Sequence, residues 1–464
     1  MPAAKASYVT KKSENVIQSL MDFLRLQSRL EAKNGKPTYA HFLGLSASPL
    51  KNDDEFDDDD EYPSFVQENQ FSFLGKSNTD KHQKEPPSLV FRYRFPSNDR
   101  LRHLFEDPHY EHEQRRVGIK SQQHQQQVRH RHNLSTYMSI MDEVTTFGLI
   151  SATPQYPRPG VSVTMQSQWG PQKMASSSLS VVTPTTDNND NDKSSSLILG
   201  EEVDIVTTIT KMGRNLGFVR AEVRDPSTGG VICFFDHVKY LPPGFLFSII
   251  LTPIGRWFVD NIYLRYNNIH HKRSVIAPTQ NNNDDYNNDD NNNGNDYSGI
   301  MDSFRITSDT TASFRFGSQH TNGLGGLHGG VQAILMERLG QVVARNEILQ
   351  LFTTATTSCS STTTDDPSGD NAINYHNNDV GVDFDVECEQ IQASYQSSAS
   401  TRRLELRAYV MDPPRLDRLS ITLRIEILRD SNKPNTNNNN NRKSVVVSEG
   451  ILTFVKKSPS SKTI

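Results

Sequence analysis

Apolar residues recur at the spacing of a single helical face in each half of the chain. In the second half this face begins near Gly329, directly after a glycine-rich stretch, and in the first half it surrounds Asp142. Such a period is typical of an amphipathic α-helix that packs against a core. The positions are Val331, Ile334, Leu335, Leu339, Val342 and Val343 in one half, and Leu134, Met138, Met141 and Val144 in the other. The pattern predicts one core helix per half.

Three segments rich in β-branched and aromatic residues follow each predicted helix, separated by turn sequences. Asp142 and Glu337 on the helices are 195 residues apart (337 − 142), and Asp225 and Asp430, which end the middle strands, are 205 apart (430 − 225). We therefore expect an α+β fold in which a helix and an antiparallel meander occur twice. The expected strands are Val203–Thr210, Leu216–Arg224 and Val231–Tyr240, then Arg402–Val410, Leu419–Leu428 and Ser444–Val455.

Long polar tracts interrupt this duplicated pattern. Residues 170–198, 280–296, 353–380 and 432–442 are rich in Ser, Thr, Asn and Asp. They hold too little apolar surface to offset the entropy of ordering, so we expect disordered insertions. Residues 13–33 read as a further helix, and the acidic run at 53–61 reads as a solvated linker.

Composition narrows the classes of function. The 464 residues carry a formal net charge of -5 and three cysteines, which predicts no nucleic-acid partner and no disulfide framework. The sequence contains no apolar run long enough for a transmembrane helix. A cytoplasmic protein is expected, although the basic residues 1–12 leave a mitochondrial address open. His109, His112 and Glu113 lie in a polar segment and are expected to be solvated, so no metal site is predicted.

The glycine-rich stretch before the second helix carries the candidate chemistry. Asn322 lies six residues before His328, Gly329 follows it at the helix start, and Glu337 lies nine residues after it. Free N–H groups at a helix N-terminus stabilise an oxyanion, and a nearby carboxylate can act as a base. A phosphate-binding P-loop is excluded because no Gly-Lys-Ser/Thr follows the glycines. A plain glycine-rich loop that leads into a core helix stays open as the alternative.

The Asn, His-Gly-Gly and carboxylate spacing resembles that of hotdog-fold acyl-CoA thioesterases. The matching residues are Asn322, His328, Gly329, Gly330 and Glu337. The resemblance implies a sheet wrapped around a long helix, and the duplication implies two tandem hotdog domains that form an intramolecular pseudo-dimer. We expect an N-terminal region at 1–87, domain 1 at 88–266, a linker at 267–300, domain 2 at 301–457 and a tail at 458–464.

The resemblance also implies how the two halves would share a site. In the first half, Asn133 and Leu134 stand where the family has His-Gly, but the carboxylate survives as Asp142 and the family's serine as Ser162. In the second half, Cys388 replaces that serine. Asn322, His328 and Gly329 would therefore face Asp142 and Ser162 in one working composite site. The other pairing, of Asn133 and Leu134 with Glu337 and Cys388, would be degenerate.

The implied activity is hydrolysis of a fatty or aryl acyl-CoA, with coenzyme A as part of the substrate and no separate cofactor. Gly330, Arg214 and Lys239 are candidates for binding the CoA part, while His237 is interpreted as packing. Relatives commonly associate further, so a homodimer of double hotdogs is an expected assembly. Two alternatives remain open: a non-catalytic acyl-CoA-binding or scaffold protein, and a hotdog hydratase or dehydratase of enoyl thioesters.

Overall fold

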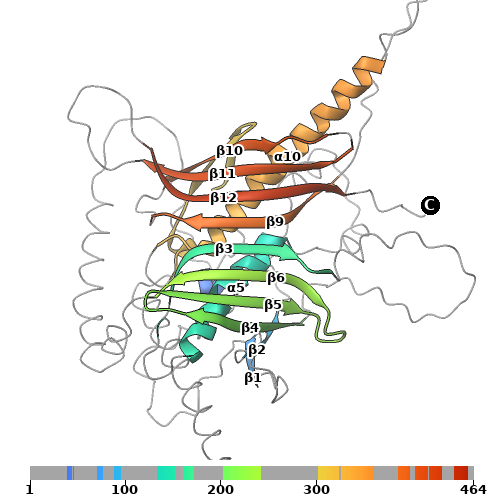
Figure 1. Ribbon diagram of the computed structural model, residues 1–464. Helices are drawn as coiled ribbons and strands as arrows, with labels where there is room; N and C mark the ends of the chain where they lie inside the picture. Colours follow the sequence, from blue (N-terminus) through green and yellow to red (C-terminus); the bar gives the residue numbers. More distant parts are fainter. Residues whose placement is uncertain are drawn as a thin grey trace, which may run out of the picture.

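The computed structural model describes the parts of the chain that form one sheet and the helices against it (Figure 1). The described residues are 39–43, 45, 71–76, 88–95, 133–152, 158, 160–171, 202–241, 301, 303–322, 326–359, 385–397, 403–415, 417–430 and 444–457. The predicted helix at 13–33, the acidic run at 53–61, the tracts at 280–296 and 432–442 and most of the other two lie outside them.

Twelve strands form a continuous antiparallel sheet. In the first half these are β1 (Phe71–Lys76), β2 (Ser88–Arg94), β3 (Val161–Trp169), β4 (Glu202–Met212), β5 (Leu216–Arg224) and β6 (Val231–Tyr240). In the second half they are β7 (Arg305–Ser308), β8 (Thr311–Arg315), β9 (Asp385–Tyr395), β10 (Arg403–Asp412), β11 (Ser420–Asp430) and β12 (Ser444–Lys457).

The strand order repeats the same topology from each edge toward the centre. It runs β1-β2-β4-β5-β6-β3 and then β9-β12-β11-β10-β8-β7. Counted within its own half, each set therefore reads first, second, fourth, fifth, sixth, third. The halves join where β3 pairs with β9, with Gln166 opposite Gln392 (Figure 1). The expected duplication of helix and meander is thus present in the connectivity of the strands.

Both long helices lie against the same side of the sheet. Helix α5 (Leu134–Ala152) contacts β3 to β6, and α10 (Gly329–Cys359) contacts β9 to β12. The two helices also contact each other, and in Figure 1 α10 extends past the edge of the sheet. Helix α10 begins at Gly329 as predicted. It continues to Cys359, however, seven residues into the tract that we expected to be disordered from 353.

Alternating burial explains how the strands cover the helices. In β5, Gly217, Val219, Ala221 and Val223 are buried and the residues between them are more exposed, which is the period of a half-buried strand. Two short elements complete the described chain: α2 (Tyr39–Phe42) and the 3-10 turn η5 (Ser318–His320) before α10. No helix in the described ranges is long and apolar enough to cross a membrane.

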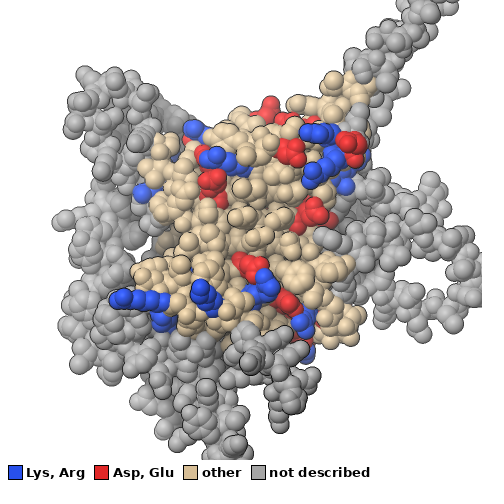
Figure 2. Space-filling view, in the orientation of Figure 1, with Lys and Arg blue, Asp and Glu red and all other residues tan. Residues whose placement is uncertain are grey.

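The opposite face of the sheet carries charges of both signs (Figure 2). Many of them pair between neighbouring strands, as Arg220 with Asp236 at 2.9 Å and Arg424 with Glu449 at 2.9 Å. Pairs that are open to solvent, as Arg220 with Asp236 is, contribute little to stability. The buried chemistry lies on the helix side, where α5 and α10 meet.

Candidate active site

The loop before α10 is closed by hydrogen bonds of its own. Asn322 Oδ1 accepts from the Gly326 N–H at 3.1 Å, and the Asn322 N–H donates to the Gly326 carbonyl at 2.8 Å. The His328 N–H donates to the His320 carbonyl at 2.9 Å. The loop delivers Gly329 to the start of α10, where the first N–H groups have no acceptor within the helix. Asn322 thus binds the backbone of Gly326, and its expected contact with substrate stays a prediction.

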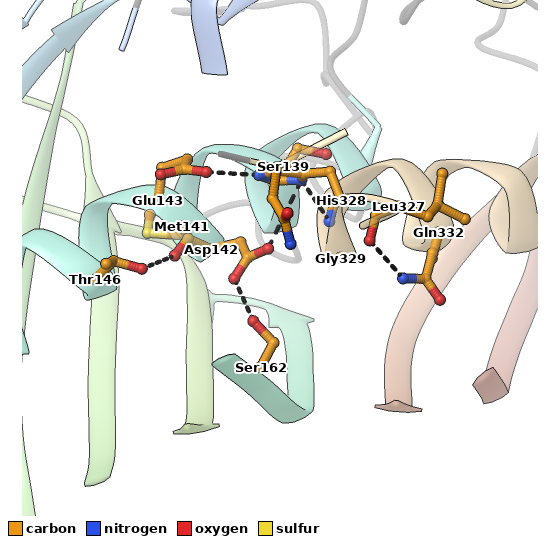
Figure 3. A network of polar contacts seen from close by, with 12 residues as sticks. Ser139, Met141, Asp142, Glu143, Thr146, Ser162, Leu327, His328, Gly329 and Gln332 are labelled. Atoms are coloured by element: carbon orange, nitrogen blue, oxygen red, sulfur yellow. Dashed lines mark hydrogen bonds and ion pairs between the residues drawn. The ribbon is translucent and has the colours of Figure 1, made fainter. Parts of the chain in front are cut away.

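Asp142 of α5 lies opposite this helix end, although it belongs to the other half of the chain (Figure 3). Its Oδ1 accepts a hydrogen bond from Ser162 Oγ at 2.6 Å and another from Lys239 Nζ at 3.0 Å. A Cβ at Gly329 would lie only 2.7 Å from Asp142 Oδ2. Only glycine therefore lets the carboxylate approach the start of α10 so closely.

The surroundings of Asp142 keep this buried carboxylate charged. Burial disfavours the ionised form, but the charge of Lys239, the neighbouring His328 and His237, and the Ser162 hydrogen bond outweigh it. The pKa of Asp142 consequently lies well below its usual range. The site therefore offers an anion fixed beside the positive end of a helix.

His328 connects α5 to α10. Its Nε2 lies 2.7 Å from Glu143 Oε1, and its Nδ1 accepts from the Gly330 N–H at 2.9 Å. In the neutral ring, the Gly330 N–H donates to Nδ1, so the ring proton is on Nε2 and is donated to Glu143. Burial lowers the pKa of His328, but the bond to Glu143 and the charge of Asp142 outweigh burial and raise it. Tyr39 of α2 packs on the imidazole, with ring centroids 4.9 Å apart.

His237 and Lys239 alternate along β6 and both point at Asp142. Lys239 is 2% exposed, so the structure places it inside the site, whereas we expected it at the rim as a phosphate partner. His237 Nδ1 lies 2.7 Å from Thr145 Oγ1. His237 Nε2 is 3.6 Å from Asp142 Oδ1 and has no hydrogen-bond partner among the described residues. Burial and then the charge of Lys239 lower the pKa of His237 well below its usual value, so the ring is neutral.

Glu337 is the residue of the second half that corresponds to Asp142, but its contacts are different. Glu337 is the ninth residue of α10, as Asp142 is of α5, but its Oε2 accepts the backbone N–H of Ser135 at 2.8 Å. Its carboxylate therefore caps the start of α5. The serine position holds Cys388, whose pKa is raised well above its usual value by burial and by Glu337.

Of the predicted site residues, the structure brings Asp142, Ser162, His328 and Gly329 together and keeps Glu337 on the other side. Gly330 lies against α5, where a Cβ would be 2.5 Å from Ser139 Cα. Arg214 is exposed in the turn between β4 and β5, and its role stays a prediction. Sequence reasoning missed the contacts of Glu143, Tyr39 and His237. The adjacency of Glu143 to Asp142, and of His237 to Lys239 at a strand spacing, were the available signals.

No family model matches the chain, and no curated protein matches it in sequence. Among solved structures, the chain shows low similarity to several proteins described as thioesterases. A protein assigned as an oleoyl thioesterase from Lactobacillus plantarum is 8% identical, with a TM-score of 0.35 over 81% of this chain and 99% of that one. The 12:0-ACP thioesterase from Umbellularia californica is 12% identical, with a TM-score of 0.31 over 70% and 91%. Thioesterase superfamily member 2 from Mus musculus is 16% identical, with a TM-score of 0.20 over 37% and 83%. These values are too low to say anything about activity.

Proposed function

We propose that the chain is an acyl-CoA thioesterase with one working site, composed of residues from two tandem hotdog units. The observation that carries the proposal is the juxtaposition of Asp142 with Gly329. An ionised carboxylate and the N-terminus of a helix face one another from different halves of the chain, and a glycine permits their close approach. A thioester carbonyl bound at the helix end would find a hydrogen-bond donor and a carboxylate within reach.

The residues then divide the reaction between them. The Gly329 N–H donates to the carbonyl oxygen as negative charge develops on it, and His328 holds the loop through Gly330. Asp142 removes a proton from the attacking water or attacks the carbonyl carbon itself, and Ser162 fixes the carboxylate. With water as the nucleophile, the C–S bond breaks, the thiolate takes up the proton that Asp142 removed from the water, and the products are the free acid and the thiol. With Asp142 as the nucleophile, the C–S bond breaks to leave a mixed anhydride, which water then hydrolyses to the free acid and the Asp142 carboxylate, while a proton of that water goes to the thiolate. Asn322 orients the water or the carbonyl group.

The strand order, which repeats from each edge of the sheet, supports the tandem arrangement. In addition, each half supplies site residues that the other half lacks. The half that retains His328 and Gly329 has Cys388 in place of the serine, whereas the half with Asp142 and Ser162 starts its helix at Leu134. Glu337 is occupied as the cap of α5. We therefore infer that the Glu337 side is structural and that catalysis occurs once per chain.

Acyl-CoA, with a fatty or aryl acyl group, is the substrate that we propose for a cytoplasmic protein. Arg214 is the candidate for a CoA phosphate, because it is exposed in the turn beyond β4. We further propose that the polar insertions are disordered and that two chains associate as a homodimer of double hotdogs.

The direct test is thiol release from acyl-CoAs of short to long chain and from phenylacetyl-CoA, with Asp142→Asn and Glu337→Gln beside the wild type. We expect turnover by the wild type, a loss of roughly 10²–10⁴-fold in Asp142→Asn, and little change in Glu337→Gln. A dead Glu337→Gln variant with an active Asp142→Asn variant would place the site at the other pairing. Binding of acyl-CoA without turnover would indicate a binding protein instead, and hydration of crotonyl-CoA would indicate a hydratase.

A further inference from the structure

Lys239 is a buried ammonium group in the site that we propose for thioester hydrolysis. Its side chain is 2% exposed, and its Nζ lies 3.0 Å from Asp142 Oδ1 and 3.4 Å from Ser162 Oγ. Buried ammonium groups are costly unless they are paired and hydrogen-bonded. The pairing therefore ties Lys239 to the carboxylate and to its serine at the same time.

Gly160 leaves space for the side chain of Lys239. A Cβ at Gly160 would lie 2.4 Å from Lys239 Cβ and 2.9 Å from Lys239 Cδ. Any other residue at 160 would therefore displace the aliphatic part of Lys239. Gly160 comes just before β3, the strand that supplies Ser162, so the path of the lysine and the position of the serine are set together.

The other half of the chain lacks the lysine. Ser162 pairs with Lys239 between β3 and β6, and Cys388 pairs with Phe454 between β9 and β12. Phe454 is thus the register equivalent of Lys239, as Cys388 is of Ser162. Lysine, serine and an uncapped carboxylate occur together on one side, while phenylalanine, cysteine and the helix-capping Glu337 occur on the other.

We propose that Lys239 is a positioning residue: its ammonium pairs with the Asp142 carboxylate and holds it facing the start of α10. This inference rests on the proposed function, because it assigns a role within that same site. The remaining titratable groups facing Asp142 are His237 of β6, His328 before α10 and Tyr395 of β9, and Glu143 faces His328. Among the described residues, Lys239 is the one cationic side chain within hydrogen-bond distance of Asp142.

The test compares Lys239→Met, which keeps a long apolar chain without the charge, with Lys239→Arg, which keeps a charge. Lys211→Met serves as the matched control, because Lys211 is exposed on β4 of the same half. We expect the acid limb of the pH profile of kcat/KM to move up by about 1–3 pH units in Lys239→Met. The limb should move less in Lys239→Arg and not at all in Lys211→Met. A folded Lys239→Met variant with an unmoved acid limb would overturn the proposal.

A spectroscopic readout separates this inference from the proposed function. The carboxyl ¹³C resonance of Asp142, assigned by its loss in Asp142→Asn, should show no protonation in the wild type down to about pH 3, below the ordinary aspartate pKa. It should titrate at higher pH in Lys239→Met. This holds even if no acyl-CoA is cleaved. Ordinary titration of Asp142 near pH 4 in the wild type would refute the role of Lys239, whatever the activity and whether or not the variants fold.

Discussion

Gly329 brings the start of α10 so close to Asp142 that a methyl group at position 329 would lie 2.7 Å from Asp142 Oδ2. The next glycine meets a different obstacle, because a methyl group at Gly330 would lie 2.5 Å from the Ser139 Cα of α5. The first neighbour is the end of a side chain, whereas the second is backbone. The two adjacent glycines therefore serve different purposes, one in the site and one in helix packing.

This difference predicts opposite outcomes for the two alanine variants. Gly329→Ala should displace the Asp142 carboxylate and lower kcat by 10-fold or more, with little loss of stability. Gly330→Ala should force α5 and α10 apart and cost about 1–3 kcal/mol of the free energy of unfolding. Urea denaturation and thiol-release kinetics on both variants would check this. If Gly329→Ala were fully active, the close approach to Asp142 would have no part in the chemistry.

We expect substitution of Glu337 to lower stability rather than activity. Its carboxylate accepts the Ser135 N–H at the start of α5, a charge-assisted hydrogen bond in a buried place. Glu337→Ala should lower the free energy of unfolding by about 1–3 kcal/mol, because the backbone N–H loses its acceptor. Glu337→Gln, which keeps an acceptor oxygen, should lose less. Chemical denaturation of both variants would reveal the order, and equal losses would contradict the capping role.

Much of the fold could be predicted from the sequence, because local patterns determine it. The strands at 216–224 and 231–240 and the helix start at Gly329 have the predicted bounds, since clear turn sequences or glycines flank them. Six strands were not among those expected: β1, β2, β7 and β8 have only four to seven residues, which carry little periodicity, whereas β3 and β9 have nine and eleven. Pairing across the sheet, rather than their own sequence, defines the four short strands.

The site was predicted less completely than the fold. Asp142 and Ser162 were placed together through the resemblance, and their hydrogen bond is present at 2.6 Å. Lys239 was expected among the groups that bind the CoA part, but it is buried beside Asp142. The alternation set by Cys233 and Phe235 on β6 carries His237 and Lys239 to the buried face. The sequence of β6 alone does not indicate that a carboxylate from α5 lies beside these two residues.

Glu143 predicts a pH-dependent contribution to stability through His328. The pKa of His328 is raised in the folded protein despite burial, chiefly through Glu143. The stabilisation is therefore fully present below the unfolded pKa, about 6.5, and is lost as pH rises through the folded pKa. Glu143→Gln should cost about 1–3 kcal/mol at pH 6 and less at pH 9, as measured by urea denaturation. Asp236→Asn, in an exposed pair with Arg220, is the control and should show only a small change at either pH.

The burial of His237 predicts a pH dependence of stability that is opposite in sign to that of His328. Its ring is buried, its Nδ1 is bonded to Thr145, and its pKa is lowered well below 6.5 by burial and by Lys239. The unfolded chain therefore binds a proton that the folded protein does not, once the pH falls below about 6.5. The free energy of unfolding should then fall by up to about 1.4 kcal/mol per pH unit on this account.

The variant His237→Gln removes the titrating group and should flatten the dependence of stability on pH between 7 and 5. The useful quantity is the difference in free energy of unfolding between wild type and variant, since His328 contributes with the other sign. As the pH falls, the free energy of unfolding of the variant should rise relative to that of the wild type. Urea denaturation at pH 7, 6 and 5 would measure it, and a constant difference would mean that His237 takes up a proton as readily in the folded protein as in the unfolded chain. In that case its Nε2, 3.6 Å from Asp142 Oδ1, would be accepting a proton beside the carboxylate instead of remaining neutral.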